Sequence, residues 1–321
     1  MPAVSVLMVF HRDTPFLRPA IASVLGQTQR DLELVLVDNG TGLSADALGA
    51  LGRDPRLQWV RLARNKGIAA GHNAGVAAAR GEFLALLDYD DVMLPDRLDR
   101  QCARLRAEPA LGLVSSLAET IDGTGRVTGR EFALVGPEAQ RRYSQFAAPV
   151  VTPAYTGRRE IFAALPYRPE FAVAADFDFL TRAAERWPMA AVPEVLLHYR
   201  RYAGQTTVQR AAQIAAERCA VRLLTARRRA GRPEGVPPVW GPNESAGAVA
   251  LACAERCIAE GFPVLAAYHA RRGMTERRSP AGLVAGLGIF LRARRAATTD
   301  RRLVTRMFFT GPVRALDLRP A

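Results

Sequence analysis

The chain has 321 residues, of which 49% are hydrophobic, and a formal net charge of +13. This length and composition fit one large domain with an appendage, or two domains, and they exclude an intrinsically disordered chain. The charge is uneven, because residues 271–321 hold 12 Arg against three acidic residues, a net charge of +9. The C-terminal region therefore favours an acidic partner more than the rest of the chain does.

The cysteines and the apolar segments give no sign of secretion or of a bilayer-spanning helix. The cysteines are Cys102, Cys219, Cys253 and Cys257. Their spacing matches no zinc motif, and we expect reduced, buried thiols. The apolar segment at 1–9 is too short for a signal peptide, and the run at 281–291 is far below the roughly 20 residues that span a bilayer. We therefore expect a cytoplasmic protein.

Strand and helix patterns alternate over the first ninety residues. Apolar runs typical of strands occupy residues 3–10, 32–38, 57–62 and 83–87. Helical patterns at 15–27 and 69–80 lie between them, and the small residues of the second predict close packing on the sheet. This rhythm predicts an α/β fold with a doubly wound, mostly parallel sheet and flanking helices.

The stretch 83–91, FLALLDYDD, places three carboxylates directly after a buried strand. Asp88, Asp90 and Asp91 fall at the carboxyl end of that strand, which is the edge of an α/β sheet where ligands bind. Carboxylates this close repel one another, and a hard divalent cation such as Mg²⁺ or Mn²⁺ removes that cost. The pattern predicts a metal site facing a phosphate. The alternative is an acidic turn that caps the following helix through Asp91.

Two other loops at this edge carry ligand-binding candidates. Asp38 ends the second strand and is followed by Asn39 and Gly40, so it either contacts a ligand or forms an Asx turn. Lys66 precedes a helix whose N-terminus could face a diphosphate, because helix N-termini carry partial positive charge and unpaired donors. A solvated lysine is the alternative.

After Asp91 the pattern changes from alternation to hairpins. A helix at 95–107 and a strand at 111–117 lead to Asp122-Gly123, where a hairpin turn is predicted. Residues 130–170 are irregular and contain five prolines, so they could shape a pocket for a second substrate.

A helix at 174–186 follows and begins with Asp176 and Asp178. Their charges complement the helix dipole, and this is the reading that the residues favour by themselves.

A strand predicted at 195–202 becomes basic and aromatic at its end. His198 lies in an otherwise apolar run, where a core histidine is more common than a metal ligand. Of Arg200 and Arg201, at most one can reach a phosphate, because adjacent strand residues face opposite ways. A long helix at 205–230 follows.

Helices are predicted near the C-terminus at 244–260, 263–272, 281–296 and 301–309. Apolar side chains share one face of the last helix, and arginines occupy the others. The apolar residues are Leu303, Val304, Met307 and Phe308, and the arginines are Arg301, Arg302 and Arg306. This arrangement suits a helix lying on an anionic membrane surface, and docking onto the main domain is the alternative.

Taken in order, these elements resemble the family 2 glycosyltransferases of the GT-A fold, which are inverting enzymes that use nucleotide sugars. The resemblance covers residues 3–207. It rests on the ordered motifs VSVLMVFHR, SVLGQT, LELVLVDNG, RNKGIAAGHNAGVAAARGEFLALLDYDD, ADFDF and YRRYAGQTT. Each motif alone is weak, whereas their order and spacing together are specific.

The resemblance implies roles for individual residues. It implies that Asp38 contacts the nucleobase and that Asp176 is the catalytic base. It also implies that Asp88 and Asp90 form a DXD motif that binds the ribose and a metal-bound diphosphate. It implies Mg²⁺ or Mn²⁺ as the cofactor, with Asp90, Asp88 and His198 as candidate ligands. The residues expected to bind the nucleotide sugar are Phe10, His11, Arg12, Asp38, Asn39, Lys66, Asn73, Asp88 and Tyr89.

The chain departs from the family pattern at four places. It has VFHR at 9–12 where PTYN or PVYN is frequent, and VDNGT where VDDGS is frequent. Ala175-Asp176 stands where Glu-Asp is usual. Tyr202 stands where the YRxH pattern has a histidine, so either His198 or a water would replace that metal ligand. A non-catalytic GT-A-like binding or scaffold protein is therefore the alternative function.

We expect a metal-assisted inverting transferase of bacterial surface-glycan synthesis, with a UDP-sugar favoured as donor. The acceptor hydroxyl could belong to a glycan, a lipid-linked molecule or a small molecule. We expect peripheral contact with the inner membrane face through the basic C-terminal region. Nucleic-acid binding is not expected, because no aromatic stacking pattern accompanies the arginines. A nucleotide-dependent oxidoreductase is disfavoured, because FHRDTP replaces the glycine-rich turn after the first strand.

The predicted domain organisation has three parts. A glycosyltransferase domain at 1–230 comprises a nucleotide-sugar half at 1–91, an acceptor half at 92–207 and a helix at 208–230. A linker at 231–242 and a basic helical region at 243–321 follow.

Overall fold

The computed structural model describes residues 1–235, 245–277 and 279–317, so most of the expected linker lies outside the described residues. The chain divides into two compact units. The sheet unit comprises Met1–Arg141 and Ala148–Tyr202, and the helical unit comprises Arg142–Ala147 and the residues from Ala203 onward. The sequence predicts that the helix after residue 205 belongs to the first domain. It belongs to the helical unit instead, where it packs with the helix that begins at Ala246.

The secondary structure follows the predicted order closely. The strands are β1 (Val4–Phe10), β2 (Leu32–Asn39), β3 (Leu57–Leu62), β4 (Phe83–Leu86), β5 (Val92–Met93), β6 (Leu113–Ile121), β7 (Val127–Arg130), β8 (Thr156–Arg158) and β9 (Met189–Arg200). The first six helices are α1 (Leu17–Leu25), α2 (Ile68–Ala78), α3 (Arg97–Ala107), α4 (Pro137–Tyr143), α5 (Arg159–Ala164) and α6 (Ala175–Arg186). The others are α7 (Thr206–Gln209), α8 (Ala211–Arg229), α9 (Ala246–Ala259), α10 (Pro263–Arg277), α11 (Pro280–Ala296) and α12 (Arg301–Ala315).

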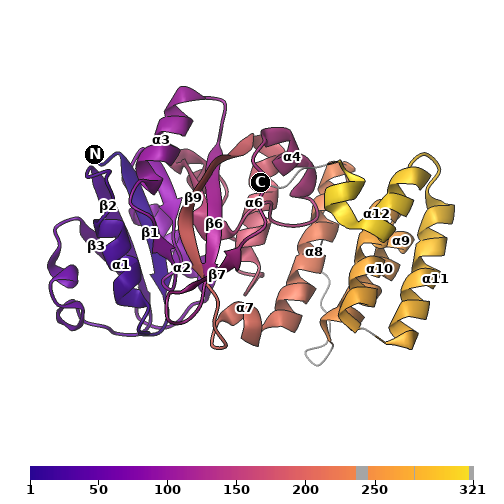
Figure 1. Ribbon diagram of the computed structural model, residues 1–321, viewed down its shortest axis with the longest axis horizontal. Helices are drawn as coiled ribbons and strands as arrows, with labels where there is room; N and C mark the ends of the chain where they lie inside the picture. Colours follow the sequence, from indigo (N-terminus) through magenta and orange to yellow (C-terminus); the bar gives the residue numbers. More distant parts are fainter. Residues whose placement is uncertain (236–244, 278, 318–321) are drawn as a thin grey trace. The chain divides into compact units, whose positions relative to one another are not determined.

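One nine-stranded sheet organises the sheet unit (Figure 1). Its order is β3-β2-β1-β4-β8-β6-β9-β5, and β7 pairs with β6. The first four strands are parallel, as the alternating pattern predicted. The irregular region supplies β8, which runs antiparallel to both β4 and β6. The α/β class is thus confirmed, but the sheet is mixed because the second half adds antiparallel strands.

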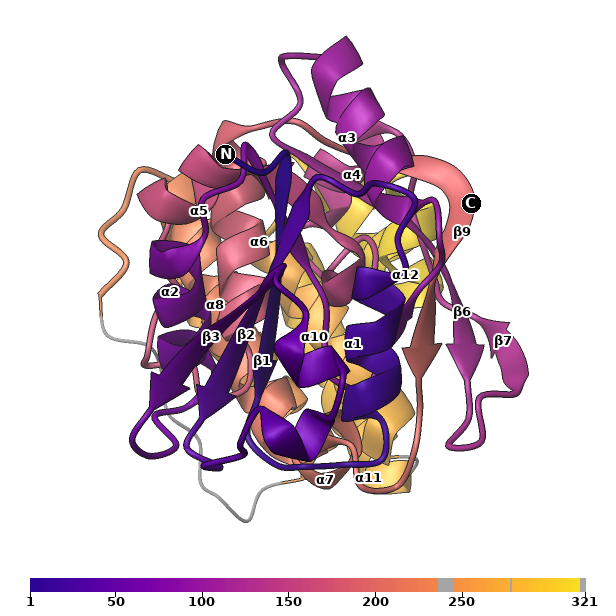
Figure 2. The same ribbon diagram turned by 90° about the vertical axis from the view of Figure 1, so that its left-hand side faces the viewer.

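Successive side chains of β1 face opposite layers of helices, with α1 and α2 on the two sides of the strand in Figure 2. Val6 and Met8 belong to the core cluster that includes α1 and α3. Leu7 faces α2, where a Cβ placed on Gly75 would lie 2.0 Å from Leu7 Cδ1. The small residues of α2 therefore permit its close approach to the sheet, as predicted.

The helical unit has its own core. Helix α10 contacts α9, α11 and α12, and Phe290 of α11 stacks on Phe308 of α12 with ring centroids 4.2 Å apart. Val304 and Met307 are fully buried. The apolar face that we expected on a membrane is therefore packed inside this unit, and that assignment to α12 is wrong.

A different helix presents apolar side chains to solvent. The exposed residues on α11 are Leu283, Val284, Leu287 and Leu291. None of the helices in the described ranges is long and apolar enough to cross a bilayer. All four cysteines are free and buried, as the sequence predicted.

Candidate active site

The carboxyl end of β4 carries a carboxylate cluster, defined here as Asp88, Asp90 and Asp91. The strand is buried along its whole length, and the chain turns directly after it, with the Asp91 N–H donating to the Asp88 carbonyl at 3.2 Å. One carboxylate oxygen from each residue lies within 4.8 Å of the others. The structure thus brings together the three acids that the sequence singled out.

Repulsion within the carboxylate cluster opposes its ionisation. Burial among protein atoms, together with the negative charges of Asp90 and Asp176, raises the pKa of Asp88 to about 8. Burial, with repulsion from the other two cluster members, also raises the pKa of Asp91. Solvent still reaches the Asp88 side chain. A bound cation would offset the repulsion between the carboxylates and would therefore lower the pKa of Asp88 again.

The donor set of the carboxylate cluster fits a hard divalent cation. Carboxylate oxygens are the ligands that Mg²⁺ and Mn²⁺ prefer. The buried Oδ2 of Asp91 has no hydrogen-bond partner within the part of the chain that the structure describes. Buried polar atoms are rarely left in this state unless water or an ion satisfies them. Helix α3 begins at Arg97 with Asp96 as its N-cap residue, so Asp91 is not the helix cap that we weighed as the alternative.

The end of β9 holds the carboxylate cluster from one side. The backbone N–H of Arg200 donates to Asp91 Oδ1 at 2.8 Å. The side-chain Nε of Arg200 donates to the Asp90 carbonyl at 2.8 Å. Arg201 pairs instead with Glu131 at 2.8 Å. As the strand alternation predicted, at most one of these arginines turns toward the ligand-binding edge, and it is Arg200.

Aromatic and basic side chains lie beside Asp90. The Tyr202 hydroxyl donates to Asp90 Oδ2 at 3.0 Å, so a tyrosine contacts the cluster from the position where the family pattern has histidine. Arg12 Nε donates to the Tyr89 hydroxyl at 2.9 Å, and His11 packs edge-on against the Tyr89 ring. Three residues predicted to bind the nucleotide sugar, namely His11, Arg12 and Tyr89, are therefore gathered next to Asp90.

A buried arginine lies behind the carboxylate cluster. Arg97 is fully buried and donates to the carbonyls of Leu86 and Tyr155 at 2.9 and 3.3 Å. Burial lowers the pKa of Arg97 to about 9, while the negative charge of Asp91 acts in the opposite direction. Arg97 therefore ties the end of β4 to the irregular region and provides positive charge near the cluster.

The two acids at the start of α6 have different environments. Asp178 is buried and paired with Arg168 and Arg182, whose Nε atoms lie 3.0 and 2.8 Å from its Oδ2. Asp176 accepts a hydrogen bond from Thr152 Oγ1 at 2.9 Å, and among the described residues no arginine or lysine pairs with it. The negative charge of Asp176 is one of the causes that raise the pKa of Asp88. Asp178 is thus structural, and Asp176 is available for chemistry.

Asp38 forms a turn at the end of β2. Its Oδ1 accepts hydrogen bonds from the backbone and hydroxyl of Thr41, both at 2.7 Å, and its Oδ2 accepts one from the Gly42 N–H at 3.0 Å. Arg61 Nη1 lies 3.5 Å from Oδ2. The Asp38 side chain thus holds the turn that follows β2 through residues three and four positions on, and a contact between Asp38 and the nucleobase stays a prediction.

Asn39 organises the loop that carries Lys66. Its side chain accepts a hydrogen bond from the Lys66 backbone N–H at 2.9 Å and donates to the Gly67 carbonyl at 3.0 Å. The Lys66 side chain is exposed just before α2. Asn39 therefore positions the lysine loop, and the contact of either residue with a nucleotide stays a prediction.

Two predicted residues, Phe10 and Asn73, have other contacts in the structure. Phe10 is fully buried and packs edge-on against Trp59, so the prediction that its side chain binds the nucleotide is wrong. The Asn73 side-chain amide donates to the Tyr167 carbonyl and accepts from the Tyr167 N–H, both at 2.8 Å. Asn73 therefore holds the irregular region against α2.

His198 also lies outside the carboxylate cluster. Its Nε2 is 3.6 Å from Glu119, and it is not among the residues that converge with the three acids. His198 therefore does not replace the missing histidine ligand in this structure, because its side chain turns to the neighbouring strand β6.

Sequence reasoning missed Arg97, Thr152 and the contact that Tyr202 makes. Tyr202 gave a signal, because it stands at the histidine position of the family pattern, but the hydrogen bond to Asp90 joins residues 112 apart in the chain. Arg97 and Thr152 carried no signal, because arginine in a helix and threonine in a loop are ordinary surface residues.

The sequence and the fold both have known relatives. A family model described as glycosyl transferase family 2 matches residues 5–165. The uncharacterized glycosyltransferase MJ1057 of Methanocaldococcus jannaschii is 29% identical over 209 residues, covering 62% of this chain and 71% of that protein. The succinoglycan biosynthesis protein ExoO of Rhizobium meliloti is 36% identical over 124 residues, covering 38% of this chain and 36% of that protein.

Among solved structures, residues 1–349 of S. aureus TarS have the same fold. The TM-score is 0.57 at 13% identity, and the match covers 96% of this chain and 88% of that chain. TarS structures in complex with UDP and with UDP-GlcNAc match with TM-scores of 0.55 and 0.56, at 15% and 13% identity, covering 96% of this chain in each case and 91% and 88% of those chains. At this level of identity the similarity concerns the fold.

Proposed function

This chain belongs to glycosyl transferase family 2, and from that premise we propose that it transfers a sugar from a UDP-sugar to an acceptor hydroxyl with inversion at the anomeric carbon. Transfer from a nucleotide sugar is the activity of the family. The observation that supports this mechanism is a carboxylate, Asp176, that has no ion pair among the described residues and acts electrostatically on Asp88, together with the cluster of three acids at the carboxyl end of β4. The fold shared with TarS, which binds UDP and UDP-GlcNAc, favours uridine in the donor.

In the proposed mechanism Asp176 acts as the general base. Its carboxylate takes the proton of the acceptor hydroxyl while the acceptor oxygen forms a bond to the anomeric carbon. The bond from that carbon to the diphosphate oxygen breaks on the opposite side, and the nucleotide diphosphate leaves with the bonding electrons. Hydrogen bonds from Thr152 Oγ1 to Oδ2 and from the Phe177 N–H to Oδ1 orient the Asp176 carboxylate, and each oxygen keeps a second lone pair that could accept the proton.

The carboxylate cluster would hold the divalent cation. Asp88 and Asp90 would supply ligands, and the unsatisfied oxygen of Asp91 is a third candidate. Mg²⁺ or Mn²⁺ bound there supplies positive charge for the departing diphosphate. Tyr202 and Arg200 hold the Asp90 side chain and backbone, so we assign them a positioning role.

The contact with a membrane is proposed at α11. Four exposed apolar residues, at positions 283, 284, 287 and 291, recur at helical spacing and lie on one face of α11. Exposed Arg294 and Arg295 follow in the last turn of the helix. An apolar stripe next to arginines fits an anionic bilayer, where the apolar side chains enter the acyl boundary and the arginines bind lipid phosphates. This contact would keep the enzyme near a lipid-linked acceptor.

The test of the transfer reaction compares the wild type with Asp176→Asn. Turnover of UDP-sugars, measured as UDP release, should fall by about 10²–10⁴-fold, because that is the usual contribution of a general base. The shift in melting temperature caused by UDP with Mn²⁺ should persist. Asp46→Asn is the matched control, since the Asp46 side chain is 80% exposed and distant in sequence from the cluster.

Two results would count against the proposal in different ways. Full activity of Asp176→Asn would remove Asp176 as the base. If no nucleotide diphosphate shifts the melting temperature with or without Mn²⁺, and no donor is consumed, the non-catalytic scaffold alternative takes its place.

A further inference from the structure

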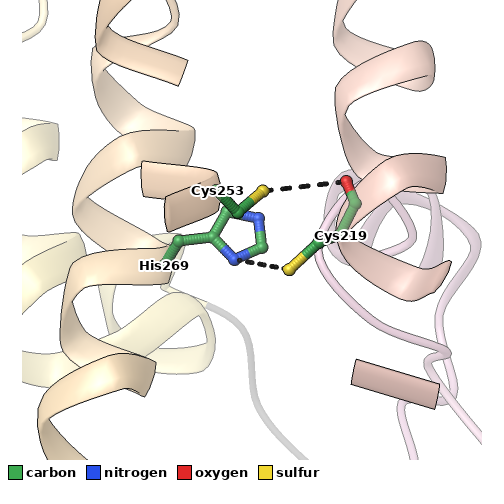
Figure 3. Close-up of side chains that lie close together, drawn as sticks. All are labelled: Cys219, Cys253 and His269. Carbon is green, nitrogen blue, oxygen red and sulfur yellow. Dashed lines mark hydrogen bonds between the residues drawn. The ribbon is translucent and has the colours of Figure 1, made fainter. Parts of the chain in front are cut away.

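Three metal-binding side chains meet inside the helical unit. Cys219 comes from α8, Cys253 from α9 and His269 from α10, and Figure 3 shows the three side chains directed toward one another. One ligand atom from each lies within 4.8 Å of the others. All three residues are buried, with exposed fractions of 1%, 0% and 0%. The carboxylate cluster lies in the other unit, so this group plays no part in the mechanism above.

The spacing of these atoms is close to that of ligands around one ion. Cys219 Sγ lies 3.5 Å from His269 Nδ1. In a tetrahedral zinc site, with Zn–S of about 2.3 Å and Zn–N of about 2.0–2.1 Å, a sulfur and a nitrogen ligand lie roughly 3.6 Å apart. A thiol–imidazole hydrogen bond explains the same distance, so this distance alone does not decide between the two.

The surroundings of His269 favour a ligand site. Its Nε2 is buried and has no hydrogen-bond partner in the described ranges, and its Nδ1 has only the weak thiol contact. Cys253 Sγ has a similarly weak contact, at 3.8 Å from the Cys219 carbonyl oxygen. A fully buried imidazole is costly when its polar atoms are unsatisfied. A metal ion takes one ring nitrogen, so an ion bound through Nδ1 would replace the weak contacts of that nitrogen and of both thiols, and it would leave Nε2 as it is.

The candidate fourth ligand is Cys257, one helical turn along α9, whose sulfur is not among the three atoms that converge within 4.8 Å. Cys257 follows Cys253 by four residues, which places both on one face of the helix, and its side chain is fully buried. Three cysteines and one histidine form a closed set of the kind found in structural zinc sites. Because solvent does not reach these residues, the site would hold helices together and would not carry out chemistry.

The charges and the ligand types select the kind of ion. Two thiolates and a neutral imidazole balance a divalent ion, and the positive charge of the buried Arg222 guanidinium acts on Cys253. Sulfur and imidazole ligands prefer Zn²⁺ to Mg²⁺ or Ca²⁺. We propose that the helical unit binds one Zn²⁺ through Cys219, Cys253 and His269, with Cys257 as the fourth ligand, and that this ion joins α8, α9 and α10.

The test uses the full-length protein, reduced and stripped of metal with a chelator. Titration with Co²⁺ as a spectroscopic probe should give thiolate-to-cobalt absorption that saturates at one equivalent, and Zn²⁺ should displace the Co²⁺. Binding should release protons, because the coordinating thiols become thiolates. Zn²⁺ should also raise the melting temperature.

Variants test which residues bind. Cys253→Ser and His269→Ala should each weaken Co²⁺ binding by about tenfold or more, whereas Cys257→Ser should retain binding with an altered spectrum. Cys102→Ser is the matched control, because Cys102 is also a buried free thiol but lies in the sheet unit. Circular dichroism of each variant shows whether it has folded, and the proton release of the wild type gives a measure that needs no variant.

Several results would overturn the proposal. These are a wild type without thiolate-to-cobalt absorption, equal Co²⁺ binding by Cys253→Ser, and a loss of binding in Cys102→Ser. A disulfide between Cys219 and Cys253 in the native protein, found by mass spectrometry together with an absence of metal, would also overturn it.

Discussion

At the scale of single residues, the contact between Tyr202 and Asp90 distinguishes this site from the family pattern. The hydroxyl donates to a carboxylate that we assign to the metal and the diphosphate. A hydrogen bond to a charged group contributes about 1.5–3 kcal/mol. Tyrosine therefore serves here to hold Asp90, at a position where histidine would be a ligand itself.

Tyr202→Phe tests this positioning role. Without the hydroxyl, Asp90 is less well oriented, and the Mn²⁺ concentration for half-maximal activity should rise by about tenfold with a smaller change in turnover. Tyr202→His should restore much of the loss. Tyr143→Phe, in the helical unit, is the control. If Tyr202→Phe changes turnover but not the Mn²⁺ requirement, Tyr202 does not act through the cation site.

Glu33 gives a pH-dependent prediction away from the active site. Burial opposes its ionisation, but hydrogen bonds from Ser5 at 2.6 Å and from the Arg80 backbone and guanidinium at 2.7 and 2.6 Å outweigh it and lower the pKa of Glu33. A carboxyl with a pKa lowered by folding stabilises the folded protein above its unfolded pKa. That contribution is lost as the pH falls through the folded value.

Glu33→Gln should therefore be less stable at pH 7, on the order of 1–2 kcal/mol, because one charge and its hydrogen bonds to Arg80 are lost. The difference from the wild type should shrink as the pH falls below the unfolded-state pKa of glutamate, about 4.3, and through the lower pKa of the folded state, because the wild-type carboxyl then becomes protonated. Melting curves across pH measure this. A difference that stays constant from neutral to acid pH would contradict the assignment.

At the scale of elements, the glycines of α2 set how closely that helix packs on the sheet. A Cβ on Gly75 would lie 2.0 Å from Leu7 Cδ1 and 3.0 Å from Val37 Cγ2. Overpacking a core costs about 1–3 kcal/mol, and replacing glycine by alanine in a helix gains about 1 kcal/mol. The packing cost exceeds the gain in helix propensity.

We expect Gly75→Ala to destabilise the sheet unit by about 1 kcal/mol. The matched control is Gly288→Ala in α11, where the nearest atom to an added Cβ is Arg292 Nη1 at 4.0 Å. With open space around it, this variant should gain up to about 1 kcal/mol. The melting temperatures of both variants test this expectation. If Gly75→Ala stabilised the protein as much as Gly288→Ala does, α2 would be able to move away from the sheet.

At the scale of the whole molecule, the net charge of +13 and the stripe on α11 should act together. The charge attracts an anionic surface over roughly 8 Å at physiological salt, and the apolar residues give the contact its strength. Binding should therefore need both anionic lipid and the exposed leucines.

The prediction is flotation with vesicles of phosphatidylglycerol but not of phosphatidylcholine, weakened by added salt. Replacing Leu283 and Leu287 together by Asn should reduce binding on the order of tenfold or more, because two exposed apolar side chains no longer enter the bilayer. Val127→Asn changes an apolar residue of similar exposure, 47%, in the sheet unit and should have no effect. Equal binding by the double variant would show that charge alone accounts for the interaction.

The sequence by itself determined the local elements and the carboxylates of the site. Strand and helix periods depend on neighbouring residues, so β1 to β4 and their helices were predicted to within a few residues. Asp88, Asp90 and Asp91 were found because acids that follow a buried strand must lie at the edge of the sheet. The antiparallel β8 was missed, because its three residues are too short to carry a period.

Only the tertiary structure decided which distant residues meet. It placed Tyr202 on Asp90, buried Phe10 in the core, turned His198 toward Glu119 and assembled Cys219, Cys253 and His269 from three helices. It also buried the apolar face of α12, and it buried Phe290 of α11 while leaving the stripe at 283, 284, 287 and 291 of that helix exposed. Both helices are amphipathic in sequence, and which face is covered depends on how neighbouring helices pack, a long-range property that no local pattern contains.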